Sequence, residues 1–329
     1  MQMTQDHASS AAAAPAIETR ALGKTYGEGV EAVRSLDLTV PRGAIYALLG
    51  PNGAGKTTTQ SILTTQARPT SGSARVNGRD VVSEADAVRR EIGVTFQEMV
   101  LDDGLTGRQV LDYHGRLYGL GARQRRDRAD ELFDLVELTE VAGRKCKTYS
   151  GGMKRRLELA RALMTAPNIL FLDEPTLGLD PQGRVRLWDY IRELRQKREL
   201  TVMLTTHYLD EAEELADRVA IIDRGQLVAE GTPSELTSAL GTDTVRLLGA
   251  GDDAAFEKIL SEAPFVSSFS RLGGGVVLAV DSASRHLAEI VTLADRADFA
   301  IQDMTIDKPS LGAVFFSRTG RQLRDGANQ

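Results

Sequence analysis

The sequence predicts an α/β fold in which a parallel sheet carries a phosphate-binding loop. Two apolar runs, Ala44–Leu49 and Ile169–Leu172, indicate buried strands of this sheet. Glycine-rich residues follow the first run, and two acids, Asp173 and Glu174, follow the second. Because the carboxyl ends of parallel strands meet at one edge of a sheet, we expect these two segments to form one site.

The composition is that of a globular chain of 329 residues, 42% of them hydrophobic, with one cysteine, Cys146. A single cysteine excludes an internal disulfide framework and a Cys-x-x-Cys metal site. The formal charge of −6 argues against general nucleic-acid affinity, so we expect no nucleic-acid partner. No window approaches the roughly 20 apolar residues of a membrane-spanning helix. Residues 1–16 lack the features of a secretory signal, and we expect a disordered leader there.

The segment that follows the first strand matches the phosphate-loop pattern G-x-x-x-x-G-K-[ST]. Its glycines let backbone N–H groups converge on a triphosphate at the start of a helix expected near Gly55. We expect Lys56 to reach the β- and γ-phosphates and the hydroxyl of Thr57 to ligate Mg²⁺. The alternative is a glycine turn with no ligand. The predicted nucleotide-binding residues here are Gly50, Pro51, Asn52, Gly53, Ala54, Gly55, Lys56, Thr57 and Thr58.

The two acids after the second strand have separate expected roles. Asp173 would complete the Mg²⁺ shell directly or through water. Glu174 would align and deprotonate the attacking water. The alternative, in which both acids cap the next element, does not explain their place at the end of a buried strand, before Pro175.

Between these elements, Tyr149–Arg156 reads YSGGMKRR and resembles the signature sequence of ATP-binding-cassette (ABC) ATPases. Ser150 and the N–H groups of Gly151 and Gly152 would form a second anion site at a helix N-terminus. The resemblance implies that this site closes on the γ-phosphate of an ATP held by a second copy of the chain. It also implies an antiparallel β subdomain and a helical subdomain beside the phosphate-loop core.

Four further residues match elements of this family in order. Gln97 matches the glutamine loop, which senses Mg²⁺ and water and links to the membrane partner. Asp180 matches the aspartate loop at the dimer seam, and His207 matches the switch histidine that contacts the γ-phosphate and supports the catalytic glutamate. Tyr26 matches the aromatic residue that stacks on adenine, although a lone tyrosine is more often a packing residue. Met153 and Tyr149 depart from the common pattern, which has glutamine and leucine there, and mark an export-type subgroup.

The remaining nucleotide-binding region is predicted from hydrophobic spacing and from the family. Residues 17–40 indicate short strands around the loop Tyr26–Val30, and Thr201–Thr205 and Val219–Asp223 indicate further strands. Residues 105–148 have helical spacing, which predicts a helical subdomain. Its expected buried face comprises Val110, Leu111, Leu117, Leu132, Phe133, Val136 and Leu138.

A second, smaller domain is expected to follow a boundary near Gly241, so that residues 17–240 and 241–319 form the two domains. The expected strands and helices alternate in the order βαββαβ, which predicts a ferredoxin-like α+β sandwich with a glycine turn at 273–275. This domain has no cluster of ligands or nucleophiles, so we expect an interaction or regulatory role. The strands expected are Thr244–Leu248, Phe265–Ser270, Val276–Val280 and Ala300–Thr305, and the helices are Ala254–Glu262 and Ser284–Arg296.

The stretch Lys308–Phe316 resembles the C-terminal stretch of the daunorubicin-resistance ATP-binding proteins. Those proteins usually have Asp-Glu where this chain has Gly312 and Ala313. The resemblance implies export of a hydrophobic small molecule. Residues 320–329 are expected to form a flexible tail.

These observations favour an ATPase subunit of an ABC exporter. It would act as a dimer with a separate ABC-2-type integral membrane permease, and it would lie in the cytoplasm, peripheral to the cell membrane. Two other classes stay open at this point. One is a soluble ABC-type ATP switch, and the other is a drug-sequestering or regulatory module that is not coupled to transport.

Overall fold

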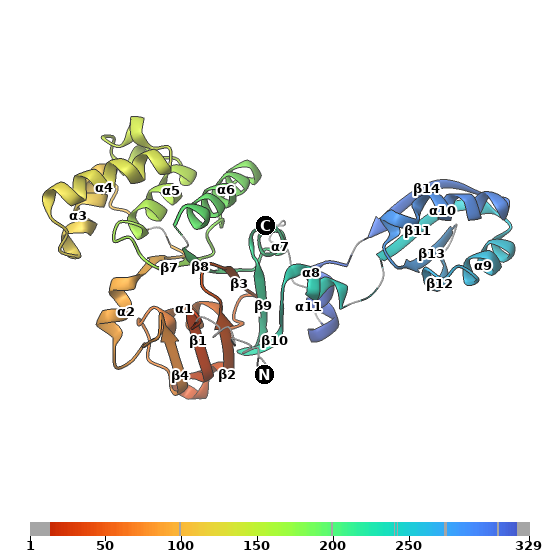
Figure 1. Cartoon of the computed structure of the whole chain (residues 1–329), viewed down its shortest axis with the longest axis horizontal. Helices are drawn as coiled ribbons and strands as arrows, with labels where there is room; N and C mark the ends of the chain where they lie inside the picture. Colours follow the sequence, from red (N-terminus) through yellow and green to blue (C-terminus); the bar gives the residue numbers. More distant parts are fainter. Residues whose placement is uncertain are drawn as a thin grey trace, which may run out of the picture. The chain divides into compact units, whose positions relative to one another are not determined.

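The computed structural model describes residues 14–98, 100–198, 200–239, 241, 243–272, 275–307 and 309–320. The chain forms two compact units that meet in sequence between Glu230 and Gly231 (Figure 1). Most of the expected leader and tail, residues 1–13 and 321–329, lies outside the described residues. Ala16, which we placed in the leader, is buried and belongs to the core of the first unit.

A six-stranded sheet forms the centre of the first unit, in the order β10-β9-β3-β8-β7-β6. Strand β3 pairs in parallel with β8 and β9, and β7 pairs in parallel with β6 and β8, as the sequence predicted. Every residue of β3 and β7 is buried, which explains why both strands are continuous apolar runs. The strands are β3 (Ile45–Leu49), β6 (Ile92–Thr95), β7 (Ile169–Asp173), β8 (Thr201–Thr206), β9 (Arg218–Asp223) and β10 (Gln226–Gly231).

Helices lie on both sides of this sheet. Figure 1 shows α1 (Lys56–Leu63) on one side, and α5 (Gly151–Ala162) and α6 (Pro181–Arg198) on the other. The short helix α7 (Leu209–Leu215) follows β8 and packs against β3. The helices α1, α5 and α7 each begin beside a predicted functional segment, so the core positions the site directly.

The second sheet of this unit is antiparallel, in the order β2-β1-β4-β5. Its first two strands flank the loop that contains Tyr26, as predicted. Apolar side chains of β1, β2 and β4 share one core with β3 and β7. The elements are β1 (Ile17–Thr25), β2 (Glu31–Val40), β4 (Ser71–Val76) and β5 (Arg79–Asp80), followed by helix α2 (Ala85–Glu91).

Two helices, α3 (Gly107–Leu117) and α4 (Ala122–Leu135), pack on each other and on α5 to form the helical subdomain. Six of the seven residues predicted for its buried face are buried. The prediction for Leu117 was wrong, because its side chain is 83% exposed. Leu117 is the last residue of α3, next to the turn at Gly119 (φ +75°), and lies beyond the part of the helix that packs.

The second unit contains the predicted βαββαβ order, and its four strands form one antiparallel sheet in the order β12-β13-β11-β14. This is the strand order of a ferredoxin-like fold. Side chains from both helices and all four strands form its core. The expected turn at Gly273 and Gly274 lies outside the described residues. The elements are β11 (Asp243–Gly251), α9 (Asp253–Ser261), β12 (Val266–Leu272), β13 (Gly275–Val280), α10 (Ala283–Arg296) and β14 (Phe299–Asp307).

Two short helices from opposite ends of the second unit, α8 (Pro233–Ser238) and α11 (Leu311–Thr319), pack on each other. This long-range contact is not visible in the sequence, and with it the second unit begins upstream of the boundary that we placed near Gly241. The hydroxyl of Ser310 caps α11 by accepting from the backbone N–H of Ala313 at 3.3 Å. Gly312 and Ala313 therefore occupy the first turn of a helix.

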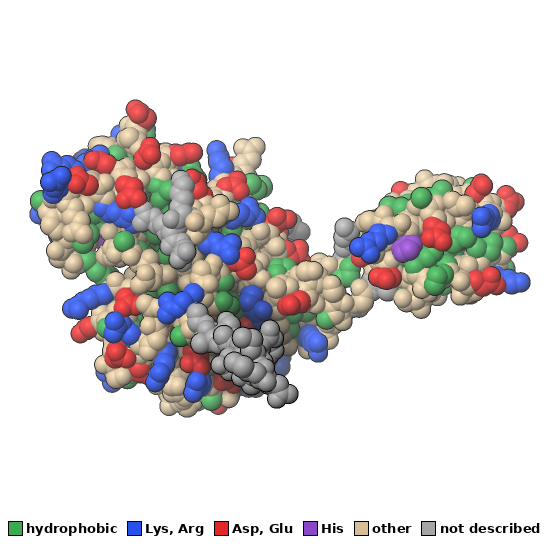
Figure 2. Space-filling view, viewed as in Figure 1, with side chains coloured by type: hydrophobic (Ala, Val, Ile, Leu, Met, Phe, Trp, Pro, Cys, Tyr) green, Lys and Arg blue, Asp and Glu red, His purple; other side chains and the backbone are tan. Residues whose placement is uncertain are grey.

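Acidic and basic side chains are interspersed over the face of the molecule that Figure 2 shows. Within the described residues, no helix combines the length and apolar character needed to span a membrane.

Candidate functional site

The predicted phosphate loop connects the carboxyl end of β3 to the start of α1. Gly55 precedes α1 with φ +103°, and a Cβ atom built there would lie 2.4 Å from the carbonyl oxygen of Ala32. At Gly50 a Cβ atom would lie 2.3 Å from the carbonyl oxygen of Ile222. Glycine is therefore required at both ends of the loop, by backbone conformation at Gly55 and by close packing at both positions.

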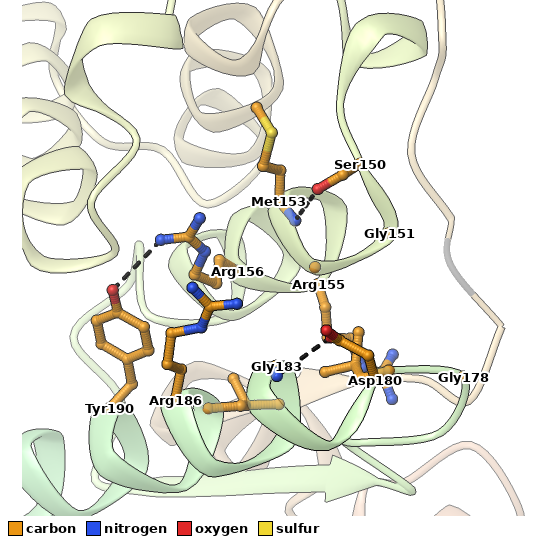
Figure 3. Close-up of a pocket in the computed structure, with 13 residues that line it drawn as sticks. Ser150, Gly151, Met153, Arg155, Arg156, Gly178, Asp180, Gly183, Arg186 and Tyr190 are labelled. Carbon is orange, nitrogen blue, oxygen red and sulfur yellow. Dashed lines mark hydrogen bonds between the residues drawn. The ribbon is translucent and has the colours of Figure 1, made fainter.

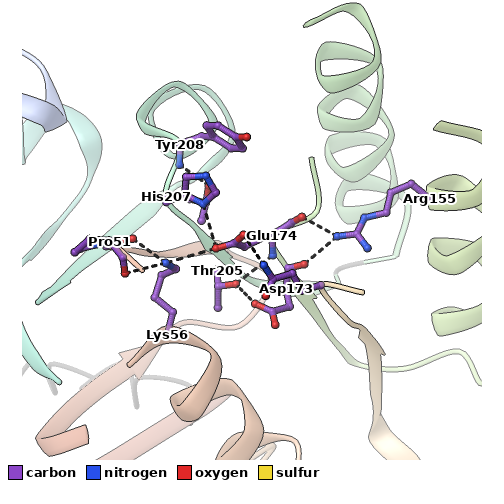
Figure 4. Close-up of polar contacts among 11 residues, drawn as sticks. Pro51, Lys56, Arg155, Asp173, Glu174, Thr205, His207 and Tyr208 are labelled. Atoms are coloured by element: carbon purple, nitrogen blue, oxygen red, sulfur yellow. Dashed lines mark hydrogen bonds and ion pairs between the residues drawn. The ribbon is translucent and has the colours of Figure 1, made fainter. Parts of the chain in front are cut away.

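Lys56 is the first residue of α1, and its side chain is only 4% exposed. The ammonium group donates to the carbonyl oxygens of Gly50 at 2.8 Å and Pro51 at 3.2 Å. It also lies 3.6 Å from Oε1 of Glu174 (Figure 4). Burial lowers the pKa of Lys56, and the charge of Glu174 opposes this shift. The side chain thus lies folded over the loop, next to the predicted catalytic acid.

Glu174 follows β7 and has a left-handed backbone with φ +46°. Its N–H donates to the carbonyl oxygen of Thr205 at 3.1 Å, which fixes the turn against β8. Its carboxylate lies 3.1 Å from Nδ1 of His207 and accepts from Nε2 of Gln97 at 3.3 Å. Burial alone would raise the pKa of Glu174, but contacts with His207 and Lys56 outweigh it, and the net pKa is lowered. The structure therefore favours an ionised carboxylate, the form that a general base needs.

Asp173, the last residue of β7, is 4% exposed and accepts a short hydrogen bond from the hydroxyl of Thr205. Burial raises the pKa of Asp173, and this hydrogen bond opposes the shift. Glu174 and Asp173 are neighbours, yet their pKa values move in opposite directions. The separate roles that the sequence predicted for the two residues stay predictions.

A cavity of about 440 Å³ lies over the phosphate loop and reaches Gln97 and Glu174. Tyr26 does not line this cavity. Its ring is 46% exposed and lies 5.0 Å from the ammonium group of Lys24. Its role in stacking on adenine stays a prediction. The lining residues are Val30, Glu31, Ala32, Pro51, Asn52, Gly53, Gly55, Lys56, Thr57, Thr58, Gln97 and Glu174.

A second cavity, of about 530 Å³, lies at the N-terminus of α5 (Figure 3). Ser150 caps this helix, and its hydroxyl accepts from the N–H of Met153 at 3.3 Å. Nothing lies within 4 Å of the Cβ positions of Gly151 and Gly152, so their backbone is accessible. Asp180 lines the same cavity, where its carboxylate accepts from the N–H of Gly183 at 3.1 Å.

The structure thus divides the predicted residues between two cavities that share no lining residue. One contains the phosphate loop with Gln97 and Glu174, and the other contains the signature residues and Asp180. His207 joins the first group through its contact with Glu174. Each cavity lies at the N-terminus of a helix, where backbone N–H groups can bind a phosphate.

Sequence reasoning missed three residues that support the site. Thr205 binds both Asp173 and the backbone of Glu174 from the adjacent strand. The ring of Tyr208 contacts that of His207 in a tilted arrangement, with ring centroids 4.2 Å apart. Arg155 donates to backbone carbonyl groups around Glu174. Of these three residues, only Arg155 could have been suspected from the sequence, because it is a basic residue shortly after Ser150 on the predicted helix.

Comparisons with known proteins identify the family. The ABC transporter family model matches residues 33–177. The chain is 44% identical over 318 residues to the daunorubicin/doxorubicin resistance ATP-binding protein DrrA of Streptomyces peucetius, covering 95% of each chain. The protein belongs to the ABC transporter ATP-binding family. The doxorubicin resistance ATP-binding protein DrrA of Mycobacterium tuberculosis is 40% identical over 92% of this chain and 93% of its own.

Solved structures of ABC cassettes show the same fold. One is an ATP-binding cassette in a dimeric post-hydrolysis state bound to ADP and Pi, which matches with a TM-score of 0.60 and 27% identity. It covers 66% of this chain and 98% of its own. The protein is therefore an ABC ATPase, and the solved cassette that it resembles is a dimer.

Proposed function

We propose that this protein hydrolyses ATP to power the efflux of a hydrophobic, drug-like small molecule through a separate ABC-2-type membrane permease. The observation that carries this proposal is the separation of the two half-sites on one chain. Lys56 and Glu174 lie in one cavity, while Ser150 and Asp180 lie in the other. A complete site then needs two copies arranged head to tail, with one ATP between each phosphate loop and the facing Ser150. The names of the relatives, which concern daunorubicin and doxorubicin resistance, support the class of substrate.

Two residues of the phosphate-loop cavity, together with Asp173 at the end of β7, fit a Mg²⁺ ion delivered with the nucleotide. The hydroxyl of Thr57, the carboxylate of Asp173 and the amide oxygen of Gln97 are hard oxygen ligands of the kind that Mg²⁺ prefers. Gln97 uses its nitrogen to bind Glu174, which leaves its oxygen for this purpose. When bound, Mg²⁺ would neutralise charge on the β- and γ-phosphates.

The protein side chains then have defined tasks. Glu174 accepts a proton from the attacking water, and its lowered pKa keeps it ionised at neutral pH. His207 holds this carboxylate in position through its 3.1 Å contact. Lys56 exchanges its bonds to the loop carbonyl groups for the phosphate oxygens.

Closure of the two copies would depend on ATP, because the nucleotide contacts the phosphate loop of one copy and Ser150 of the other. Hydrolysis removes these contacts and allows opening. This cycle would drive the permease through the segment that begins at Gln97. The protein would accordingly work in the cytoplasm, attached to the inner face of the membrane through the permease.

Mixing two inactive variants tests the proposed head-to-tail arrangement of the two copies. Lys56→Ala removes the phosphate-loop half, and Ser150→Arg blocks the signature half. In a head-to-tail mixed dimer, one composite site combines both defects and the other is intact. We therefore expect ATP hydrolysis to reappear on mixing, when each variant alone is inactive.

A second mixture is the matched control. Lys56→Ala and Glu174→Gln alter the same half-site, so every mixed dimer has two defective sites and should stay inactive. If ATP hydrolysis returned in neither of the two mixtures, the head-to-tail arrangement would be contradicted. Co-purification of the wild-type chain with a polytopic membrane protein tests the exporter assignment, and its absence from membranes that hold the permease would contradict that assignment.

A further inference from the structure

One buried arginine, Arg155, connects helix α5, which Ser150 caps, to the turn that contains Glu174. Arg155 is 5% exposed, and its guanidinium group donates to three consecutive carbonyl oxygens. Nη2 lies 2.9 Å from that of Asp173 and 2.7 Å from that of Glu174, and Nε lies 2.8 Å from that of Pro175 (Figure 4).

The same side chain also reaches the glutamine loop. Nη1 of Arg155 donates to the carbonyl oxygen of Phe96 at 2.7 Å. It further pairs with Glu158 at 3.1 Å, one turn along the same helix. Glu158 is fully buried, and its second carboxylate oxygen accepts from the N–H of Val100 at 3.0 Å. Arg155 and Glu158 therefore hold both sides of the short segment that contains Gln97.

The backbone conformation explains why this turn needs such a partner. Glu174, with its left-handed φ, directly follows the last residue of β7, so the carbonyl group of Asp173 lies at the end of the strand and those of Glu174 and Pro175 lie beyond it. Buried carbonyl groups need donors. A planar guanidinium offers five N–H donors in fixed directions, which suits several carbonyl oxygens around one point. A lysine has one nitrogen and cannot reproduce these directions.

We propose that Arg155 and Glu158 are positioning residues for ATP hydrolysis. They hold Glu174 and Gln97 in one relative geometry, and they tie that geometry to α5, the helix that Ser150 caps. Arg155 also lines the cavity at the N-terminus of α5, so it lies between the two half-sites of the chain. This inference rests on the proposed function, because it takes Glu174 as the base and Ser150 as the contact for the phosphate bound to the other copy.

The first test compares kcat with nucleotide affinity in the full-length protein. For Arg155→Lys we expect kcat to fall about 10- to 100-fold, the size of effect that a small misplacement of a catalytic group produces. Affinity for a fluorescent ATP analogue should change less than about threefold, because the phosphate loop is untouched. Glu158→Gln, which keeps an oxygen for Val100 but weakens the pair with Arg155, should lower kcat in the same direction and by less.

Arg125→Lys is the matched control. Arg125 is also largely buried and donates to a backbone carbonyl, that of Leu120, and to the carboxylate of Asp112. It belongs to the helical subdomain and touches neither the glutamine loop nor the turn at Glu174. Its kcat should stay within about twofold of wild type. Thermal unfolding of all three variants separates loss of stability from loss of positioning.

A double-variant comparison separates positioning from a general structural effect. If Arg155 acts through Glu174, then Arg155→Lys should lower single-turnover hydrolysis much less in a Glu174→Gln background than in the wild type. An equal fold-loss in both backgrounds would overturn the inference, as would wild-type kcat in Arg155→Lys. If the proposed function itself were wrong, the result would differ. Glu174→Gln would then keep normal turnover, both with Arg155 intact and with Arg155→Lys.

Discussion

Nδ1 of His207 lies 3.1 Å from Oε1 of Glu174, whose backbone N–H donates to the carbonyl oxygen of Thr205. The ring of His207 is held in turn by Tyr208, on whose face the guanidinium of Arg184 lies 4.1 Å from the centroid. The carboxylate of Glu174 is thus contacted by Gln97 after β6, His207 after β8 and Lys56 in α1.

Replacing Glu174 by glutamine should preserve the shape of the site and remove the base. We expect turnover to fall by on the order of 10²–10⁴ with ATP affinity retained. Steady-state hydrolysis and binding of a fluorescent ATP analogue measure the two effects. Glu257→Gln, which alters an exposed acid of the second unit, is the control. Near-normal turnover in Glu174→Gln would exclude Glu174 as the base.

Asp173→Asn should make the protein more stable and inactive. Burial raises the pKa of Asp173, so ionisation of this group at neutral pH opposes folding. Asparagine has no such charge and can still accept from Thr205. The gain in melting temperature over wild type should be largest near pH 7. It should shrink as the pH falls through the raised folded pKa and disappear below the ordinary value of 3.8, where wild-type Asp173 is protonated. A gain that is independent of pH would contradict this cause.

Tyr26 can be tested by comparing two substitutions. Stacking of a base on an aromatic ring contributes about 1–3 kcal/mol, so Tyr26→Ala should weaken ATP binding about 5-fold or more. Tyr26→Phe keeps the ring and should bind ATP normally. Tyr113 has similar exposure in the helical subdomain, and Tyr113→Ala serves as the control. Equal affinity in Tyr26→Ala and wild type would assign this tyrosine to packing.

Introducing acidic residues at Gly312 and Ala313, at the start of α11, should stabilise that helix. Gly312 and Ala313 lie in its first turn, where a negative charge interacts favourably with the helix dipole by about 0.3–1 kcal/mol. Gly312→Asp with Ala313→Glu should therefore raise the free energy of unfolding of the second unit. High salt should reduce the gain. Gly312→Asn with Ala313→Gln carries no charge and controls for helix propensity, and an equal gain there would exclude the electrostatic cause.

Much of the fold was predictable because its signals are local. The apolar runs at β3 and β7, the glycines of the phosphate loop and the capping pattern at Ser150 each depend on a few neighbouring residues. The same is true of the βαββαβ order in the second unit, whose segments alternate regularly.

The features that were missed depend on distant parts of the chain. Thr205 reaches Asp173 because β8 pairs with β7 in one particular register. The contact of α8 with α11 joins segments at the two ends of the second unit. Leu117 has the spacing of a buried residue, but α3 ends there. Hydrophobic pattern alone contains no information on register, pairing of distant helices or the exact end of packing.

The left-handed backbone of Glu174 has a consequence for how this position tolerates change. A residue with a β-carbon in that conformation costs about 1–2 kcal/mol relative to glycine. A protein selected for robustness alone would accept glycine or asparagine there. The position therefore combines a strained backbone with a carboxylate that its partners stabilise, and Glu174→Gly should relieve the backbone strain but remove the buried pair with Lys56 and abolish ATP hydrolysis.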